Sequence, residues 1–149
     1  MITAAGVVPS SLLFEVPESA LAQNLEELLG VLGQLEGVGV RLVVGGFGRG
    51  YISLSHVHRM PINYVRLDSE FIQGLNMNEH SDAIVSALIS FAHDLGIGVV
   101  ASGITSKAQA RYLQEKKCAV VSGPWVSPLL ASEALQQFVI SGARIRKLH

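Results

Sequence analysis

Short apolar runs alternate with longer amphipathic segments along the whole chain. The short runs are nearly continuously apolar, as buried strands are. The strand candidates are residues 11–16, 39–44, 62–68, 97–102 and 118–122. The longer segments repeat apolar residues at helical spacing. The helix candidates are residues 19–35, 51–60, 80–96, 105–117 and 131–142. This alternation predicts five βα units.

Segment 80–96 illustrates the helical signal. Ile84, Leu88 and Phe91 fall on one stripe, and Gly96 stands where a helix commonly ends. Strands that are apolar throughout and separated by helices indicate a parallel sheet buried on both faces. Ligands of such folds bind at the carboxyl ends of the strands, so the residues after each apolar run are the candidate site.

One of these strand ends is rich in glycine. Leu42, Val43 and Val44 are followed by four glycines within residues 45–50, and then by a segment that begins like a helix. A strand, a glycine loop and a helix start resemble a phosphate-binding turn, although glycines are also what a tight turn requires. The loop fits neither G-x-G-x-x-G nor the P-loop, and its only charged residue is Arg49. A phosphate-binding α/β domain therefore ranks last among the functions considered.

The composition excludes several classes of protein. The 149 residues are 49% hydrophobic and 15% charged, which predicts one globular domain over residues 1–149. A net charge of −1 gives no case for binding nucleic acid. The single cysteine, the missing basic signal region and the lack of a run of ~20 apolar residues predict a cytoplasmic protein without a membrane span. The mean hydropathy of +0.40 indicates apolar surface that a partner or a second copy covers.

The motifs at the strand ends resemble the C-terminal part of the EAL domain family, which comprises bacterial cyclic di-GMP phosphodiesterases and their inactive relatives. "FEVPES" is similar to the family's Leu-Glu-Ile-Thr-Glu-Ser, and "MPINYVRLDSEFI" to Leu-Pro-x-Asp-x-Leu-Lys-Ile-Asp-x-x-Phe-Val. "LVVGGFGRGYISL" is similar to Leu-Ala-Leu-Asp-Asp-Phe-Gly-Thr-Gly-Tyr-Ser-Ser-Leu. The resemblance implies an α/β fold of about five βα units, like the later part of a TIM-like (β/α)₈ barrel with a mostly parallel sheet. It also implies that residues 1–149 form a single partial, degenerate EAL-like domain.

Several functional positions depart from the family pattern. The two adjacent aspartates that help to hold divalent metals in the family correspond to Gly45 and Gly46. The family's threonine in the same loop is Arg49, and its lysine before the last aspartate is Arg66. The glutamate of the family's Ala-Glu-Gly motif is Ser102.

These departures remove side chains that metal-assisted hydrolysis requires. That chemistry needs divalent cations held by several oxygen ligands. The resemblance leaves Glu15 as one metal-binding carboxylate and Glu18 as a loop-supporting one. Arg66 cannot exchange a proton as a lysine can, although it remains able to hold a phosphate. The expectation is therefore no catalytic residue, no Mg²⁺ or Mn²⁺ site and no other cofactor.

The remaining motif residues define a vestigial ligand-binding site. Its members are Glu15, Glu18, Phe47, Arg49, Arg66, Asp68 and Trp125. Several have a structural alternative. Glu15 and Glu18 suit the first turn of helix 19–35, where acids complement the helix N-terminus. Asp68 suits the cap of the next segment. Trp125 is either a stacking platform for a base or, preferably, a plug for the mouth of the barrel.

Three functions are compatible with the resemblance. The first is a catalytically inactive EAL-like signalling module that acts through protein–protein contacts in bacterial cyclic di-GMP signalling. The second is a degenerate cyclic di-GMP receptor, in which Arg49, Arg66 and Trp125 contact phosphate and guanine. The third, ranked below both, is an active phosphodiesterase.

The number of strands leads to an expectation about assembly. A closed (β/α)₈ barrel takes about 250 residues, and five strands cannot close it. Two strands are then sheet edges, which invite pairing with another chain. A homodimer or higher oligomer with a largely apolar interface is expected. The alternative is a relaxed, open, doubly wound sheet with helices on both faces.

Overall fold

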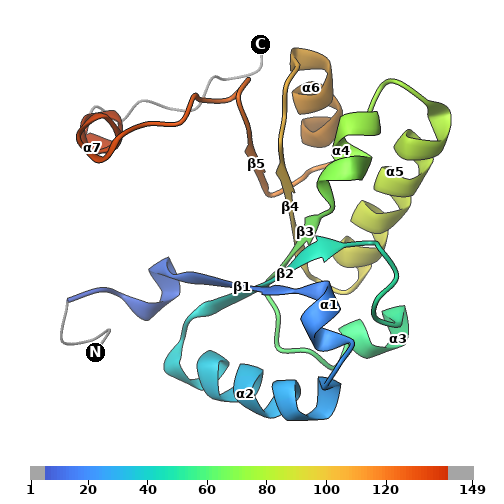
Figure 1. Cartoon of the computed structure of the whole chain (residues 1–149), viewed down its shortest axis with the longest axis vertical. Helices are drawn as coiled ribbons and strands as arrows, with labels where there is room; N and C mark the ends of the chain where they lie inside the picture. The colour runs from blue at the N-terminus through green and yellow to red at the C-terminus, as the bar shows by residue number, and fades with distance from the viewer. Residues whose placement is uncertain (1–5, 141–149) are drawn as a thin grey trace.

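The chain folds around one sheet of five parallel strands in the order β1-β2-β3-β4-β5. A computed structural model describes residues 6–140. The strands are β1 (Leu13–Pro17), β2 (Arg41–Phe47), β3 (Tyr64–Leu67), β4 (Gly98–Ser102) and β5 (Val120–Ser122). The twisted sheet runs through the middle of the molecule in Figure 1. All five predicted strands are confirmed.

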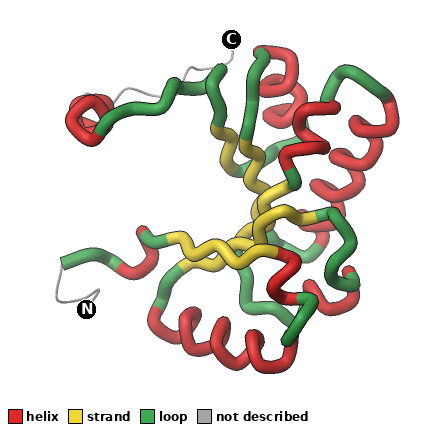
Figure 2. Tube along the Cα trace, in the orientation of Figure 1, coloured by secondary structure: helices red, strands yellow, loops and turns green. Residues whose placement is uncertain are grey.

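The strand order distinguishes between the two predicted architectures. Each strand pairs in parallel with the next one along the chain. Right-handed crossovers between sequential parallel strands place all the connecting helices on one side of the sheet. This is the arrangement of a barrel segment, and Figure 2 shows the helices that connect the strands, α1 to α6, gathered on one side of the sheet, with η2 and α7 apart from them. The alternative of a doubly wound sheet is wrong, because that fold reverses its strand order and has helices on both faces.

The helices range from single turns to the 16 residues of α5. They are η2 (Pro9–Ser11), α1 (Glu18–Leu21), α2 (Leu25–Val38), α3 (Leu54–Val57), α4 (Ser69–Gly74), α5 (Glu79–Asp94), α6 (Lys107–Glu115) and α7 (Ser132–Ile140). Helix α6 begins with a capping box, in which the Ser106 and Gln109 side chains bond each other's backbone N–H groups.

Two helix predictions need correction, and one helix was not predicted. The helix predicted over residues 19–35 is two helices, because Asn24 adopts a non-helical backbone with φ −148° immediately before α2. The helix predicted over residues 51–60 shrinks to α3, since its cap is Ser53. Helix α4 was not predicted. The predicted end of the last helix, residues 141 and 142, lies outside the described residues.

The main core lies between the sheet and its helices. The buried strand residues that face this side are Leu42, Val44, Phe47, Val65, Leu67, Val99 and Ala101. They pack against buried side chains of the helices, among them Leu21, Leu32, Val57, Ile72, Val85, Ile89 and Leu113. The core therefore fixes β2, β3 and β4 most firmly.

The two edge strands are less covered than predicted. Leu13 of β1 is 48% exposed and Val120 of β5 is 47% exposed. No helix of residues 6–140 lies over the other face of the sheet in Figure 1. The expectation of a sheet buried on both faces is therefore wrong for β1 and β5, whereas the central strands are buried.

Helix α7 stands apart from the sheet at the end of an extended segment (Figure 1). Leu129 in this segment is fully exposed, and Leu135 on the helix is half exposed. This segment is therefore a second area of apolar surface, beside β5.

Candidate functional site

The carboxyl ends of β1, β2 and β3 enclose a hollow of about 320 Å³. Its lining residues are Glu15, Pro17, Glu18, Ser19, Gly45, Gly46, Arg49, Tyr51 and Asp68. Parallel strands bring their carboxyl ends to the same edge of the sheet, so motifs that are far apart in the sequence meet here. We define this hollow as the strand-end site.

Strand β2 passes through the first two glycines before the loop begins. The pairing between β2 and β3 shifts register between Val44 and Phe47, and Gly46 lies in the left-handed region at φ +69°. This irregularity places Phe47 on the same face as Val44, whereas strict alternation would place it on the face of Val43.

The irregularity overturns one predicted site residue. The Phe47 side chain is buried and stacks on Phe91, with ring centroids 6.4 Å apart. It does not line the strand-end site. Phe47 is therefore a core residue.

Glu18 holds the glycine loop. Its side chain is buried and accepts hydrogen bonds from the backbone N–H of Arg49 (3.2 Å) and of Ile52 (3.3 Å). The Glu18 carboxylate does not cap helix α1, because α1 has no side-chain cap hydrogen bond. It bonds to the glycine loop instead. Glu18 therefore fixes where the loop leaves β2.

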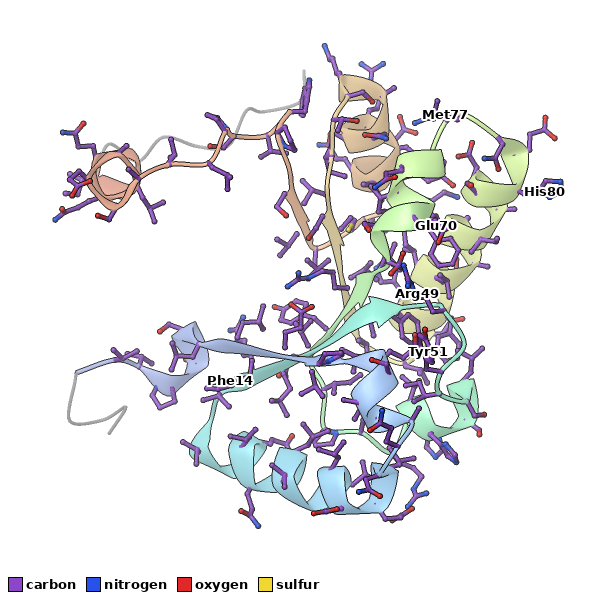
Figure 3. The ribbon with its side chains drawn as sticks, in the orientation of Figure 1. Phe14, Arg49, Tyr51, Glu70, Met77 and His80 are labelled. Atoms are coloured by element: carbon purple, nitrogen blue, oxygen red, sulfur yellow. The ribbon has the colours of Figure 1, made fainter. Side chains whose placement is uncertain are left out.

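Arg49 forms a two-pronged ion pair with Asp68. Its Nε donates to Oδ2 of Asp68 at 2.6 Å, and a terminal nitrogen donates to Oδ1 at 3.1 Å. The Glu70 carboxylate is 4.0 Å from the same guanidinium. Figure 3 labels Arg49 between Glu70 and Tyr51. Such bidentate pairs are among the stronger hydrogen-bonded ion pairs in proteins.

Asp68 also caps helix α4. Its Oδ1 accepts the backbone N–H of Glu70 at 2.9 Å, so the predicted capping role is confirmed. Burial alone would raise the pKa of Asp68, but the hydrogen bonds from Arg49 and from the Glu70 N–H outweigh it. The pKa of Asp68 therefore lies below its ordinary value, and the carboxylate is ionised at neutral pH.

Glu15 pairs with Arg66 across the sheet. Glu15 lies on β1 and Arg66 on β3, and the ion pair between them passes over Gly45 on β2. A side chain at position 45 would overlap the Glu15 carboxylate. The Nε of Arg66 is buried and has no hydrogen-bond partner among residues 6–140.

The structure thus brings together five of the seven predicted residues. Glu15, Glu18, Arg49 and Asp68 line the strand-end site, and Arg66 is tied to it through Glu15. Trp125 is not among the lining residues. It is half-buried against the main core, and its backbone N–H donates to Ile104 at 3.0 Å.

Tyr51 was not predicted as a site residue. It follows the glycine loop directly and lines the strand-end site. The aromatic position is shared with the family motif, so the signal was present in the sequence. The last two strands both end in a serine, and the Ser122 hydroxyl donates to that of Ser102 at 3.2 Å.

The residues at this site do not fit a divalent metal. Within the described part of the chain, no three or more His, Cys, Asp or Glu side chains are grouped so that they could hold a metal ion. The carboxylates of Glu15 and Asp68 are each already bound by a guanidinium. Mg²⁺ and Mn²⁺ favour several free oxygen ligands, so this donor set suits neither.

Between residues 6 and 140, no helix is both long enough and apolar enough to span a membrane.

The sequence comparisons identify similar proteins. The family model described as "EAL domain" matches residues 1–128. The cyclic di-GMP phosphodiesterase NbdA of Pseudomonas aeruginosa is 33% identical over 135 residues, which cover 91% of this chain and 17% of NbdA. The signaling protein YkoW of Bacillus subtilis is 34% identical over 132 residues, which cover 89% of this chain and 16% of YkoW. The chain therefore spans about a sixth of the length of these relatives.

The structural comparisons agree. The PaMucR phosphodiesterase, solved as a complex with c-di-GMP, superposes with a TM-score of 0.85 at 30% identity and covers 90% of this chain and 54% of that one. The EAL domain of Mycobacterium smegmatis DcpA gives a TM-score of 0.87 at 28% identity over 95% of this chain and 63% of that one. This chain spans less than two thirds of either solved chain, and its fold is confirmed as a segment of their barrel.

Proposed function

Because the chain belongs to the EAL domain family, we propose that it is a catalytically inactive EAL module that acts through protein–protein contacts in bacterial cyclic di-GMP signalling. The observation that carries the proposal is the state of the two carboxylates at the strand ends. Glu15 and Asp68 are each paired with an arginine, and Gly45 and Gly46 offer no side-chain ligand between them.

Hydrolysis of a phosphodiester requires groups that activate water and stabilise the leaving oxygen. The strand-end site offers no group for the first task. Glu18 is occupied by the loop backbone, and the guanidinium of Arg66 does not deprotonate in proteins. The proposed module therefore neither cleaves cyclic di-GMP nor holds the family's Mg²⁺ or Mn²⁺.

A degenerate cyclic di-GMP receptor is the second candidate. It is favoured by the similarity to PaMucR, which was solved with c-di-GMP, and by the two arginines at the site. Binding a phosphate through these arginines requires it to displace Asp68 or Glu15. The displaced carboxylates would then repel the phosphate, so the receptor ranks below the inactive module.

Exposed apolar surface supports the protein-contact part of the proposal. A hollow of about 920 Å³ lies beside β5, and its apolar lining includes Val121, Pro124, Val126, Leu130 and Leu135. Contiguous apolar surface of this kind is typical of interaction sites. Such contacts are made with a protein partner or with a second copy of the chain in the cytoplasm.

Two measurements on one sample test the proposal. Cyclic di-GMP is incubated with the chain and Mn²⁺, and the products are separated by chromatography, with the PaMucR phosphodiesterase as the positive control. Calorimetry with cyclic di-GMP then separates the module from the receptor. The proposal predicts no product and no binding heat at high micromolar nucleotide. Product would overturn the inactive module, and heat without product would replace it with the receptor.

A further inference from the structure

We infer that Arg49 and Arg66 act as built-in cations, which supply from within the chain the positive charge that divalent metals supply in a metal-dependent site. Their role is to hold the glycine loop, residues 45–50, in one conformation without metal. This inference deepens the proposed function and rests on the loss of the metal site.

The first built-in cation acts across three strands. Arg66 on β3 reaches Glu15 on β1, and Gly45 on β2 lies beneath their contact. Pro17 and Gly45 are register partners, so β1 ends level with Gly45, while β2 continues to Phe47. A side chain at position 45 would overlap the Glu15 carboxylate in its present place, so the ion pair takes this position over a residue that has no side chain.

The second built-in cation acts beside the neighbouring glycine. Arg49 donates to Asp68 through two nitrogen atoms. A Cβ atom at position 46 would lie 3.7 Å from Asp68 Oδ2. An aspartate at position 46 would therefore add a second negative charge close to Asp68. Each of the two glycines therefore lies beside one ion pair: Gly45 beside Glu15–Arg66 and Gly46 beside Arg49–Asp68. At both positions the family's acid is absent and an arginine binds the neighbouring carboxylate.

Arg49 connects the loop to two different parts of the fold. Its backbone N–H donates to Glu18 of α1, and its side chain binds Asp68 at the start of α4. The Ile52 N–H donates to the same Glu18 carboxylate. The loop is therefore anchored on both sides by charged hydrogen bonds, which are stronger than neutral ones.

Charge explains why a metal would not compete. Among Glu15, Glu18, Asp68, Arg49 and Arg66 there are three negative and two positive charges. A divalent cation entering this cluster would meet two guanidiniums at close range and would have to displace them. Removing both arginines would leave the Glu15 and Asp68 carboxylates without their counter-charges, and this uncompensated negative charge would attract a divalent cation.

Hydrogen–deuterium exchange of the loop amides tests the inference, with and without millimolar Mn²⁺. The proteins are the wild type, the double variant R49T/R66M and the control R59M. Arg59 forms an exposed ion pair with Glu26 outside the strand-end site. We expect Mn²⁺ to leave the wild-type and control loops unchanged. In R49T/R66M the amides of residues 48–52 should exchange about tenfold faster, and Mn²⁺ should slow them again.

Each contrary result overturns the inference. It is wrong if the loop of R49T/R66M exchanges at the wild-type rate, if Mn²⁺ does not slow it, or if Mn²⁺ slows the wild-type loop. Circular dichroism checks the fold of each variant. If the double variant does not fold, R49T alone carries the same test at Asp68. Hydrolysis of cyclic di-GMP by the wild type would overturn the proposed function through a different readout.

Discussion

Glu15 and Arg66 pair across the strand that separates them. Glu15 belongs to β1 and Arg66 to β3, and the contact passes over Gly45 of β2, which has no side chain to block it. Three positions that are far apart in the sequence are therefore coupled, and a change at any one of them affects the other two.

Restoring the family's acidic pair in the loop should not restore turnover. In G45D/G46D the aspartate introduced at position 45 requires the Glu15 carboxylate to move and places a second negative charge beside it. The aspartate introduced at position 46 lies close to Asp68, whose carboxylate repels a second negative charge. Ser102 still lacks a carboxylate. The measurement is cyclic di-GMP turnover with Mn²⁺, after circular dichroism has confirmed folding. Product above the background of the wild type would show that the glycines alone prevent catalysis.

Replacing Glu18 should destabilise the fold. In E18A two backbone N–H groups of the loop lose their buried acceptor, and an unsatisfied buried donor costs about 1–3 kcal/mol. We expect the free energy of unfolding in urea to fall by about 2–3 kcal/mol. The control is E36A, because Glu36 is exposed on α2. Its replacement should change the free energy of unfolding by no more than about 0.5 kcal/mol. Equal stability of E18A and E36A would contradict the role of Glu18 in holding the loop.

Acid should lower the free energy of unfolding, partly by protonating Asp68. The folded-state pKa of Asp68 lies below its ordinary value of 3.8, so its ionised form contributes stability above that pH. This contribution is lost as the pH falls below 3.8 and through the folded-state pKa. D68N keeps a good helix cap but cannot titrate, so its free energy of unfolding should fall less steeply over this range. Urea unfolding at several pH values, with the exposed D94N as control, provides the comparison. Identical slopes for D68N and the wild type would contradict the assignment.

The segment beside β5 should mediate association. Leu129 is fully exposed there, and the apolar hollow continues to Leu135. We expect the chain to form a homodimer or higher oligomer at micromolar concentrations, and L129D to shift it toward the monomer. Light scattering gives the mass. M77D is the matched control, since Met77 is 80% exposed but lies away from α7 (Figure 3). A monomeric wild type, or an equal loss of association in L129D and M77D, would exclude this surface as the interface.

The repeated strands were predictable because each is a short apolar run followed by a turn signal. The run at 97–102, for example, differs by one residue from β4 (Gly98–Ser102). Helix α4 was missed because six residues are too few to establish a helical stripe. The break before α2, at Asn24, was missed because apolar spacing continues across it.

The residues of the candidate site were predictable from the sequence, but their ion-pair partners were not. The family motifs pointed to Glu15, Glu18, Arg49, Arg66 and Asp68, and four of these side chains line one hollow. The partners could not be predicted, since they depend on strand register and on side chains that cross a strand. Phe47 was assigned wrongly for the same reason, because the irregularity near Gly46 turns its side chain into the core.

In the proposed function, metal-dependent hydrolysis is lost because acids are exchanged for glycines and paired arginines. The PaMucR phosphodiesterase is altered at the positions that align with Gly45, Gly46, Arg49 and Arg66 so that it carries these residues, and its cyclic di-GMP turnover is measured with Mn²⁺. We expect a folded protein with no detectable product and no response of its thermal stability to Mn²⁺. Turnover within about tenfold of the unaltered enzyme would contradict it.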